Sequence, residues 1–421
     1  MLEQKTDVIV VGAGLSGLAC ARAIQRAGRI AHLYEASDGV GGRVRTDNIE
    51  GFLLDRGFQV LFTAYPAIKS EIDLPALQLK AFDPGAIILH EDKRYPLYDA
   101  FRVPSQMLNT MLSPLFGAED KMRLARLRLH LMSQTTEQIF RMPDQTTTDY
   151  LLGYGFSQEF LNRFARPFYG GIFLDKSLCT SARMFAFTFK MLSEGQTALP
   201  VQGMGAMAEQ IAADLSPHTI HLNSKVTRLL KKGDRVIGIV LSDGTEVQAE
   251  QVVLATEANV TAELSGLDIP RASLSSTCLY FEVPEAFYSE KLLLLFADPT
   301  TLVNNASLLT NVAPSYAPAG KHLLSATVLG NPNLSEAVMA ERVKTEIGAA
   351  YANANTEAWR LLRVYRVAWS QFAQPVGVWE SLPESRSPID GLILAGEITV
   401  SSSLHGALSA GQKAAQIALN P

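Results

Sequence analysis

The sequence predicts an α/β protein of two domains, and three observations lead to this prediction. The chain has 421 residues, which is too long for one ordinary hydrophobic core. It opens with an apolar run that ends in glycines and passes into a helical pattern, the order of a strand, a turn and a helix. Glycine-rich segments return in the middle and near the far end of the chain, so we expect the first domain to be discontinuous.

Composition and charge narrow the class of partner. The chain is 47% apolar and 19% charged, with 37 Lys and Arg against 42 Asp and Glu, a net charge of −5. This balance argues against nucleic acid as a partner, because phosphate backbones bind basic surfaces. Three separate cysteines (Cys20, Cys179 and Cys278) predict neither a disulfide framework nor a thiolate zinc site, and no spacing of ligand residues indicates a metal. We expect no signal peptide and no membrane span, hence a cytoplasmic protein, at most peripheral to a membrane.

The first motif is a nucleotide-binding turn. The apolar run from Asp7 to Val11 predicts a strand buried on both faces, and the G-x-G-x-x-G spacing of Gly12, Gly14 and Gly17 follows it. Gly12 permits a tight turn, Gly14 lets the backbone approach a pyrophosphate, and Gly17 lets helix and strand pack closely. A helical pattern then runs to Gly28. This order predicts a Rossmann-type unit whose helix N-terminus faces phosphates.

A carboxylate ends the second strand of this unit. The apolar run 30–34 is followed by Glu35, 23 positions after Gly12, where an acid accepts hydrogen bonds from a ribose. An acid at this position favours an unphosphorylated adenosine ribose, so the sequence predicts FAD or NAD and not NADP.

A second glycine-rich turn follows the ribose acid directly. The stretch ASDGVGGRVRT places Gly41 and Gly42 before Arg43 and Arg45. It resembles the GG-R motif of flavoproteins in the amine oxidase and phytoene desaturase superfamily. The resemblance implies that the arginine reaches the diphosphate of FAD and that the glycines let the chain pass the ribityl. Because nicotinamide dehydrogenases lack this element, the expected cofactor is FAD.

Two later stretches extend the resemblance. Segment 198–215 looks like the family's P-x-G-G-M-G-x-L turn and helix, and a poor strand before it argues against a second, NAD(P)H site. The strand near Val226 corresponds to one that runs along the adenine, and the Asp243–Gly244 pair predicts a hairpin after it. The closing segment 387–419 resembles the family's strand, A-G-D/E turn and glycine-alanine helix. By resemblance, its acid meets the ribityl and diphosphate region, and its helix N-terminus faces the flavin.

These motifs predict a discontinuous Rossmann-type FAD-binding domain with an inserted α+β substrate domain, like that of amine oxidases and desaturases. The FAD-binding domain takes residues 1–70, 196–265 and 375–421, and the substrate domain takes 71–195 and 266–374. No cysteine lies near the closing motif, so we expect non-covalent FAD. The predicted cofactor-binding residues are Gly12, Ala13, Gly14, Leu15, Ser16, Gly17, Glu35, Ala36, Gly41, Gly42, Arg43, Val226, Gly396, Glu397, Leu404, Gly406 and Ala407.

Residues of the substrate domain distinguish the branches of this superfamily, which act on different substrates. The branches include amine oxidases, protoporphyrinogen oxidases, and carotenoid desaturases and isomerases. In amine oxidases a lysine near flavin N5 lies on a strand that corresponds to residues 272–284. This run holds no lysine, and our alignment puts Thr277 at that position. The departure disfavours amine oxidation.

Aromatic residues concentrate in residues 161–175, around Arg166 and Tyr169. They suit a pocket for a long apolar substrate, although aromatic residues at helical spacing more often form a core. Arg166 and Tyr169 are therefore pocket candidates, and Arg166 has a structural ion pair as its alternative role. The resemblance places His405 beside the flavin, where it could relay a proton or cap the backbone.

Residues 121–132, rich in Arg and Leu, predict a helix. Its cations fall in two sectors of the helical wheel, whereas a helix that lies on a membrane has one apolar face. Packing between neighbouring helices is the favoured role, and peripheral membrane contact stays open as the alternative.

Together these observations predict an FAD-dependent oxidoreductase that removes hydride from a C–H bond of a small apolar substrate, as carotenoid desaturases or porphyrinogen oxidases do. Dioxygen or a quinone would accept the electrons. One alternative is an amine or amino-acid oxidase without the usual lysine. The other is a redox-neutral flavin-dependent isomerase or a non-catalytic flavin-bearing binding protein.

Overall fold

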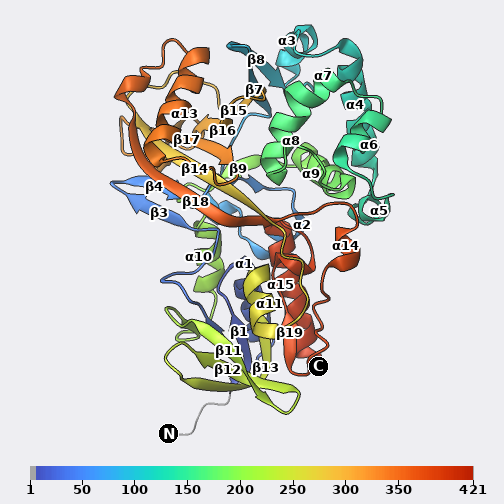
Figure 1. Cartoon of the computed structure of the whole chain (residues 1–421), viewed down its shortest axis with the longest axis vertical. Helices are drawn as coiled ribbons and strands as arrows, with labels where there is room; N and C mark the ends of the chain where they lie inside the picture. The colour runs from blue at the N-terminus through green and yellow to red at the C-terminus, as the bar shows by residue number, and fades with distance from the viewer. Residues whose placement is uncertain (1–5, 421) are drawn as a thin grey trace.

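The computed structural model describes residues 6–420, and its strands form two large sheets toward opposite ends of the long axis (Figure 1). The first sheet contains β1 (Thr6–Val11), β2 (Ala31–Tyr34), β10 (Ile220–His221), β11 (Val226–Lys232), β12 (Arg235–Leu241), β13 (Glu246–Leu254) and β19 (Leu392–Leu394). Its centre is parallel, because β1 pairs in parallel with β2 and β13, and β13 pairs in parallel with β19. The central stretches Val8–Val11, Val252–Leu254 and Leu392–Leu394 are apolar and buried, as the centre of a parallel sheet requires. The predicted α/β class is confirmed.

Two helices from opposite ends of the chain pack together on this sheet. Helix α1 (Leu15–Arg26) follows β1, and α15 (Leu404–Leu419) follows β19 (Figure 1). A side chain at Gly411 of α15 would place its Cβ 2.2 Å from the Ser16 carbonyl oxygen. Glycine at this position therefore lets the two helix backbones approach each other closely.

The second sheet is mainly antiparallel and belongs to the upper part of Figure 1. Its strands, in spatial order, are β18 (Arg360–Phe372), β14 (Ser273–Val283), β17 (His322–Leu329), β16 (Val303–Leu308), β15 (Leu293–Phe296), β7 (Gly85–His90) and β8 (Lys93–Tyr98). Helix α13 (Glu336–Ala350) packs on one face through a shared apolar cluster. Helix α8 (Arg166–Phe173) contacts β15 and β16 from the side of the helical layer.

The remaining elements form that helical layer and the connections between the sheets. The layer holds α3 (Met107–Leu112), α4 (Ala118–Ser133), α5 (Thr136–Arg141), α6 (Thr147–Gly153), α7 (Gln158–Phe160), the π-helical turn η3 (Leu161–Ala165) and α9 (Ala182–Glu194). The connections hold β3 (Thr46–Ile49), β4 (Phe52–Asp55), β5 (Leu61–Phe62), α2 (Pro66–Glu71), η1 (Pro75–Leu77), β6 (Lys80–Ala81), η2 (Pro104–Gln106), β9 (Thr197–Leu199), α10 (Ala206–Ala213), α11 (Ala258–Ser265), α12 (Leu309–Val312), η4 (Pro314–Tyr316), η5 (Thr356–Ala358), α14 (Val378–Ser381) and η6 (Glu397–Thr399). Within residues 6–420, none of these helices has the length and apolarity to cross a bilayer.

The predicted elements of the nucleotide motif are confirmed to within a few residues. Helix α1 ends at Arg26, and Gly28 follows with a left-handed φ of +83°. The hairpin predicted at Asp243–Gly244 is present between β12 and β13. The five-segment domain division stays a prediction, and every strand of the first sheet comes from a segment assigned to the FAD-binding domain.

Asp55, at the end of β4, is a buried carboxylate that links several of the segments connecting the two sheets. It accepts hydrogen bonds from the Thr46 hydroxyl (2.5 Å), the Met204 N–H (2.9 Å) and the Tyr316 hydroxyl (3.0 Å). The Tyr280 hydroxyl from β14 donates to the Asp55 carbonyl oxygen at 2.9 Å. Burial raises the pKa of Asp55 to about 6, because the ionised carboxylate loses its hydration.

This burial predicts how stability depends on pH. The folded-state pKa lies above the ordinary value of an aspartate, so the folded protein binds the proton more tightly than the unfolded chain does. The stabilisation is present at low pH and is lost as the pH rises from about 4 to about 6, a change of roughly 3 kcal/mol. Asp55→Asn keeps the shape and carries no charge. We expect the variant to match the wild type near pH 4 and to unfold at higher urea near pH 8; equal pH profiles for the two proteins would contradict the assignment.

Candidate active site

A single cavity of about 1080 Å³ extends from the edge of the first sheet, past the second sheet, to α3 and α4. Its first part is lined by the turn after β1 and by the end of β2. Its middle is lined by Arg43, Arg56 and Glu397 and by residues close to them in the sequence. Its far part is lined by residues of the helical layer. The predicted residues that line it are Gly12, Gly14, Leu15, Ser16, Glu35, Ala36, Gly41, Gly42, Arg43, Val226, Gly396, Glu397, Leu404, Ala407 and Tyr169.

The two glycine-rich turns lie against each other at the first part of the cavity. The Gly41 N–H donates to the Ala13 carbonyl at 2.8 Å, and a Cβ on Gly42 would lie 3.4 Å from the Gly14 Cα. Gly12 has a φ of +100°, which makes the tight turn that the sequence predicts. Gly17 lies outside the cavity lining, where a Cβ would meet the Gly12 carbonyl oxygen at 1.9 Å. Its role is the close packing predicted for the third glycine.

Gly14 provides a test of whether a dinucleotide fits. It precedes α1 in an extended conformation (φ −71°, ψ 176°) that any residue adopts. A Cβ there would have no protein atom within 4 Å, and it would point into space beside the N-terminus of the helix. The helix N-terminus offers N–H groups and a partial positive charge. The open space and the donors together fit a pyrophosphate.

Glu35 is held in place at the same end of the cavity. Its Oε2 accepts from the Ala13 N–H at 2.8 Å, and its Oε1 accepts from the Ser37 N–H at 2.9 Å and the Ser37 hydroxyl at 2.7 Å. Val226 and Ala36 line the cavity nearby. A fixed carboxylate beside apolar contacts fits a ribose and an adenine ring.

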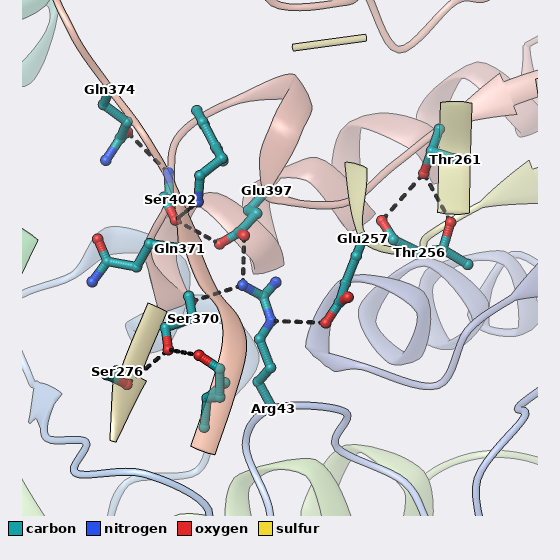
Figure 2. A network of polar contacts seen from close by, with 12 residues as sticks. Arg43, Thr256, Glu257, Thr261, Ser276, Ser370, Gln371, Gln374, Glu397 and Ser402 are labelled. Atoms are coloured by element: carbon teal, nitrogen blue, oxygen red, sulfur yellow. Dashed lines mark hydrogen bonds and ion pairs between the residues drawn. The ribbon is translucent and has the colours of Figure 1, made fainter. Parts of the chain in front are cut away.

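Arg43 joins three distant segments in the wall of the cavity (Figure 2). Its Nη1 donates to Glu397 Oε1 at 2.6 Å and to the Ser370 carbonyl at 2.9 Å, and its Nε lies 3.9 Å from Glu257 Oε1. The Ser402 hydroxyl donates to the other Glu397 oxygen at 3.0 Å. Burial opposes the charge of Arg43, but the ion pair with Glu397 prevails and raises its pKa. The guanidinium thus binds protein oxygens and lines the site at the same time.

The N-terminus of α15 reaches the cavity through only some of its predicted residues. The Ser403 hydroxyl caps the helix by accepting from the Gly406 N–H at 2.9 Å, and Leu404 and Ala407 line the cavity. Gly406 itself lies outside the lining, because a Cβ there would meet the Ser401 carbonyl oxygen at 1.9 Å. Chain packing therefore requires this glycine.

His405 lies outside the cavity lining, and its contacts are those of its alternative role, a backbone cap; its position beside the flavin stays a prediction. Its Nδ1 accepts from the Ala67 N–H at 3.2 Å, and its ring stacks on Tyr65 with the centroids 5.7 Å apart. Burial lowers the pKa of His405 to about 4, so the ring is neutral near pH 7. The i+1 position on a helix turns its side chain away from the face that lines the cavity, and His405 caps the backbone of α2 instead.

Thr277 also lies outside the cavity lining. Its hydroxyl donates to the Gly330 carbonyl at 2.9 Å, on the face of β14 that points away from the cavity. Side chains alternate along a strand, so the neighbouring Ser276 lines the cavity and exchanges a hydrogen bond with the Ser370 hydroxyl at 2.7 Å (Figure 2). Ser276 and not Thr277 therefore lines the cavity from this strand, the correspondence of Thr277 to the lysine position stays a prediction, and neither residue is a lysine.

Some residues of the aromatic segment 161–175 line the cavity, and others hold the backbone behind it. Phe164, Phe168 and Tyr169 line the cavity, and burial raises the pKa of Tyr169, which keeps its hydroxyl protonated. Arg166 lies outside the lining and donates to the Lys176 and Ser177 carbonyls at 2.8 and 3.0 Å, so its place as a pocket residue is corrected. The π-helical turn η3 precedes α8 here, and such turns often occur at functional sites.

Several lining residues escaped sequence reasoning. Gln59 Oε1, Thr188 Oγ1, Asn304 Oδ1, Asn305 Nδ2 and Thr327 Oγ1 belong to lining residues and are buried with no hydrogen-bond partner among residues 6–420. The two adjacent asparagines inside a buried strand were the one available signal, since buried polar groups are normally paired. Arg56, Gly57, Thr256, Glu257 and Gln371 also line the cavity and carried no motif. Among the described residues, no group of three or more His, Cys, Asp or Glu could hold a metal.

Comparisons with known proteins agree with this geometry. The model of the family described as flavin containing amine oxidoreductase matches residues 15–419. Probable polyamine oxidase 4 of Arabidopsis thaliana is 24% identical over 97% of this chain and 86% of its own. Phytoene dehydrogenase of Streptomyces griseus is 25% identical over 75% of this chain and 71% of its own. The crystal structure of an oxidoreductase from Methanosarcina mazei superposes with a TM-score of 0.76 and 17% identity over 98% of this chain and 100% of that one, which shows the shared fold.

The site around Gly14 makes a testable prediction about FAD. We expect Gly14→Val to fold normally and to bind FAD about a hundredfold more weakly, because its side chain displaces the pyrophosphate from helix N–H groups worth about 1.5–3 kcal/mol per bond. Isothermal titration of apoprotein with FAD measures this loss.

Gly117→Val is the matched control. Gly117 precedes α4 in a similar extended conformation (φ −63°, ψ 157°), also with no atom within 4 Å of a Cβ, and lies outside the cavity lining. Equal FAD affinities of the two variants would exclude Gly14 from the cofactor site.

Proposed function

This chain belongs to the flavin-containing amine oxidoreductase family and is an FAD-dependent oxidoreductase, and on that premise we propose that it removes hydride from a C–H bond of an apolar substrate. The observation that supports this best is the wall of the far part of the cavity. Phe164, Phe168 and Ile172 line it together with Leu124 and Met184. An apolar wall gains free energy by removing an apolar substrate from water.

FAD, when bound, supplies a two-electron acceptor for the hydride. The chain has three tasks: to hold FAD at the glycine turns, to aim the substrate, and to exclude water. The aromatic wall orients the substrate and excludes water from it. The ion pair between Arg43 and Glu397 holds together the segments that would enclose the cofactor. The hydroxyl of Tyr169 stays protonated, so it can donate but does not act as a base near neutral pH.

The amine oxidase alternative has less support from the same wall. Residues 272–284 hold no lysine, and Ser276, which lines the cavity from this strand, has its hydroxyl engaged by Ser370. Asp99, which lines the far part, forms an ion pair with Arg128 and therefore has its charge compensated. A cationic amine would have to compete for this acid.

Two adjacent asparagines in the cavity wall have amide atoms without a hydrogen-bond partner among residues 6–420. Asn304 donates to the Pro167 carbonyl at 3.2 Å and to Asn305 Oδ1 at 3.1 Å, which fixes the orientation of both amides. Asn304 Oδ1, Asn305 Nδ2 and the Thr327 hydroxyl then have no hydrogen-bond partner among residues 6–420, although their residues line the cavity, and each of these atoms is itself buried.

We propose dioxygen or a quinone as the electron acceptor. The glycine pair of segment 198–215 supports this choice, because it has a packing role. The Gly205 N–H donates to the Thr46 hydroxyl at 2.9 Å, and a Cβ on Gly203 would lie 2.4 Å from the same side chain. This turn is filled by protein and leaves no cradle for a nicotinamide cofactor.

The experiment is anaerobic reduction of the bound flavin by candidate substrates. The loss of the flavin's visible absorbance measures the rate of this reduction. We expect polyenes or porphyrinogens to reduce it, and Phe168→Asp to slow this reduction about tenfold or more, because a carboxylate in an apolar wall repels the substrate. Leu152→Asp on α6 is the control, since Leu152 is exposed and lies outside the lining.

The Phe168→Asp and Leu152→Asp variants should both keep their FAD. Reduction by a panel of amines but by no apolar compound, with release of peroxide in air, would replace the proposal with the amine oxidase alternative. Conversion of a polyene with no net oxidation would point to a redox-neutral isomerase.

A further inference from the structure

A buried tyrosine on α8 leaves its hydroxyl free in the far part of the cavity. Tyr169 is 4% exposed and lines the cavity. Burial and the charge of Asp99 raise its pKa, and no hydrogen bond with another residue in the range 6–420 contributes. Some polar atoms of the wall, such as Thr188 Oγ1, are sealed off by protein, but the Tyr169 hydroxyl is not one of them. Its O–H is therefore a donor that faces the cavity without a protein acceptor.

Aromatic neighbours hold the ring of Tyr169 in place. The ring meets that of Phe185 edge-on, with the centroids 4.7 Å apart, and lies nearly parallel to that of Phe189 at 6.5 Å. Both neighbours belong to α9, which lies beside α8 in Figure 1. Phe173, one turn further along α8, adds a ring at 6.2 Å. A phenylalanine would make the same ring contacts, so packing explains the ring of Tyr169 and its fixed position but not its hydroxyl.

The side chains that line the cavity next to Tyr169 are apolar. Phe168 and Phe189 touch its ring and line the cavity, as does Met184 of α9. A buried donor without an acceptor costs free energy, which a bound acceptor recovers. Pockets for small molecules combine apolar walls with a few polar groups that fix the orientation of the ligand. The Tyr169 hydroxyl has the position and the chemistry of such a group.

The charge near the hydroxyl indicates which acceptor fits. Among residues 6–420, the charge that acts on the pKa of Tyr169 is the negative one of Asp99, and no cation opposes it. Asp99 also lines the cavity, and its ion pair with Arg128 occupies that cation. A ligand carboxylate at the hydroxyl would be repelled by Asp99. An ammonium group has no acceptor for the O–H. An uncharged oxygen accepts the hydrogen bond and avoids both difficulties.

We propose that Tyr169 is a specificity-determining residue whose hydroxyl donates a hydrogen bond to an uncharged oxygen, a hydroxyl or a carbonyl, of an otherwise apolar substrate. This inference rests on the function proposed above and narrows its substrate class. The substrate is an apolar compound that carries a neutral oxygen, and that oxygen lies at the aromatic part of the cavity, away from the glycine turns.

The same contact distinguishes between related substrates. A hydrocarbon that fills this part of the cavity leaves the Tyr169 O–H without an acceptor, whereas a compound with an oxygen at that point does not. A site with a buried donor for a ligand oxygen discriminates against the analogue that lacks this oxygen. Because the ring of Tyr169 is held by its neighbours, the donor loses little conformational entropy when it binds the ligand.

Binding of three retinoids to the FAD-loaded protein tests this inference. The probes are all-trans-retinol, its deoxy analogue with the same carbon skeleton, and retinoic acid, each in the same detergent. Perturbation of the flavin's visible spectrum under anaerobic conditions gives each Kd. We expect Tyr169→Phe to lose about five- to tenfold of the wild-type preference for retinol over deoxyretinol, because one hydrogen bond is removed. Comparison between proteins cancels the different partition of the probes into detergent.

Tyr150→Phe is the matched control. Tyr150 lies on α6, and its ring also contacts that of Phe185, with the centroids 6.0 Å apart, but it lies outside the cavity lining. This variant loses a tyrosine hydroxyl from the same helical layer, and it should keep the wild-type preference for retinol.

Four outcomes would overturn the inference. They are an unchanged preference in Tyr169→Phe, an equal loss in Tyr150→Phe, a larger loss for retinoic acid than for retinol in Tyr169→Phe, and a wild type whose flavin responds to none of the probes. Anaerobic reduction of the wild-type flavin is measured separately. If apolar compounds reduce it and Tyr169→Phe keeps the preference, this inference fails alone. If no apolar compound reduces it, the proposed function fails.

Discussion

The architecture depends on a close approach of the first and last helices that only glycine allows. Gly17 packs α1 against the turn after β1, and Gly411 lets α15 lie on Ser16 at the start of α1. The Gly396 N–H then donates to the Ser16 hydroxyl at 2.8 Å, which joins the two ends of the chain by a buried bond. As a result the N-termini of both helices reach one cavity. The pyrophosphate of FAD lies between the adenosine and the ribityl-flavin, so an extended FAD can meet one helix N-terminus with its pyrophosphate and the other with its flavin.

The rest of the molecule builds a second compartment onto this pair. The ion pair of Arg43 with Glu397 and the contact with Ser370 connect the glycine turns, the last strand and β18. Asp55 makes a similar connection on the other side, between β4, the turn at Met204 and η4, at the cost of a buried carboxylate. Between these junctions the cavity passes from polar walls near Glu35 to aromatic walls near Phe168. This gradient matches a polar cofactor followed by an apolar substrate.

The sequence predicted the cofactor end well and the substrate end poorly, for a physical reason. Gly12, Gly14 and Glu35 act through the backbone and through fixed spacing within one β-α-β unit, so their order along the chain determines their position. The substrate end is assembled from strands distant in sequence, where one residue of slip exchanges Thr277 for Ser276. His405 and Arg166 also lie outside the cavity lining, because a helical neighbour of a lining residue faces another direction.

The central claim is that one extended FAD joins the two helix N-termini and presents its flavin to the aromatic part of the cavity. A crystal structure of the FAD-loaded protein tests it most directly. We expect the pyrophosphate at the N–H groups of Gly14 and Leu15, the adenosine ribose on Glu35, and the flavin ring near Leu404 and Ala407, with its open face toward Phe168. A purified protein that binds no FAD, or a flavin bound outside this cavity, would contradict the account.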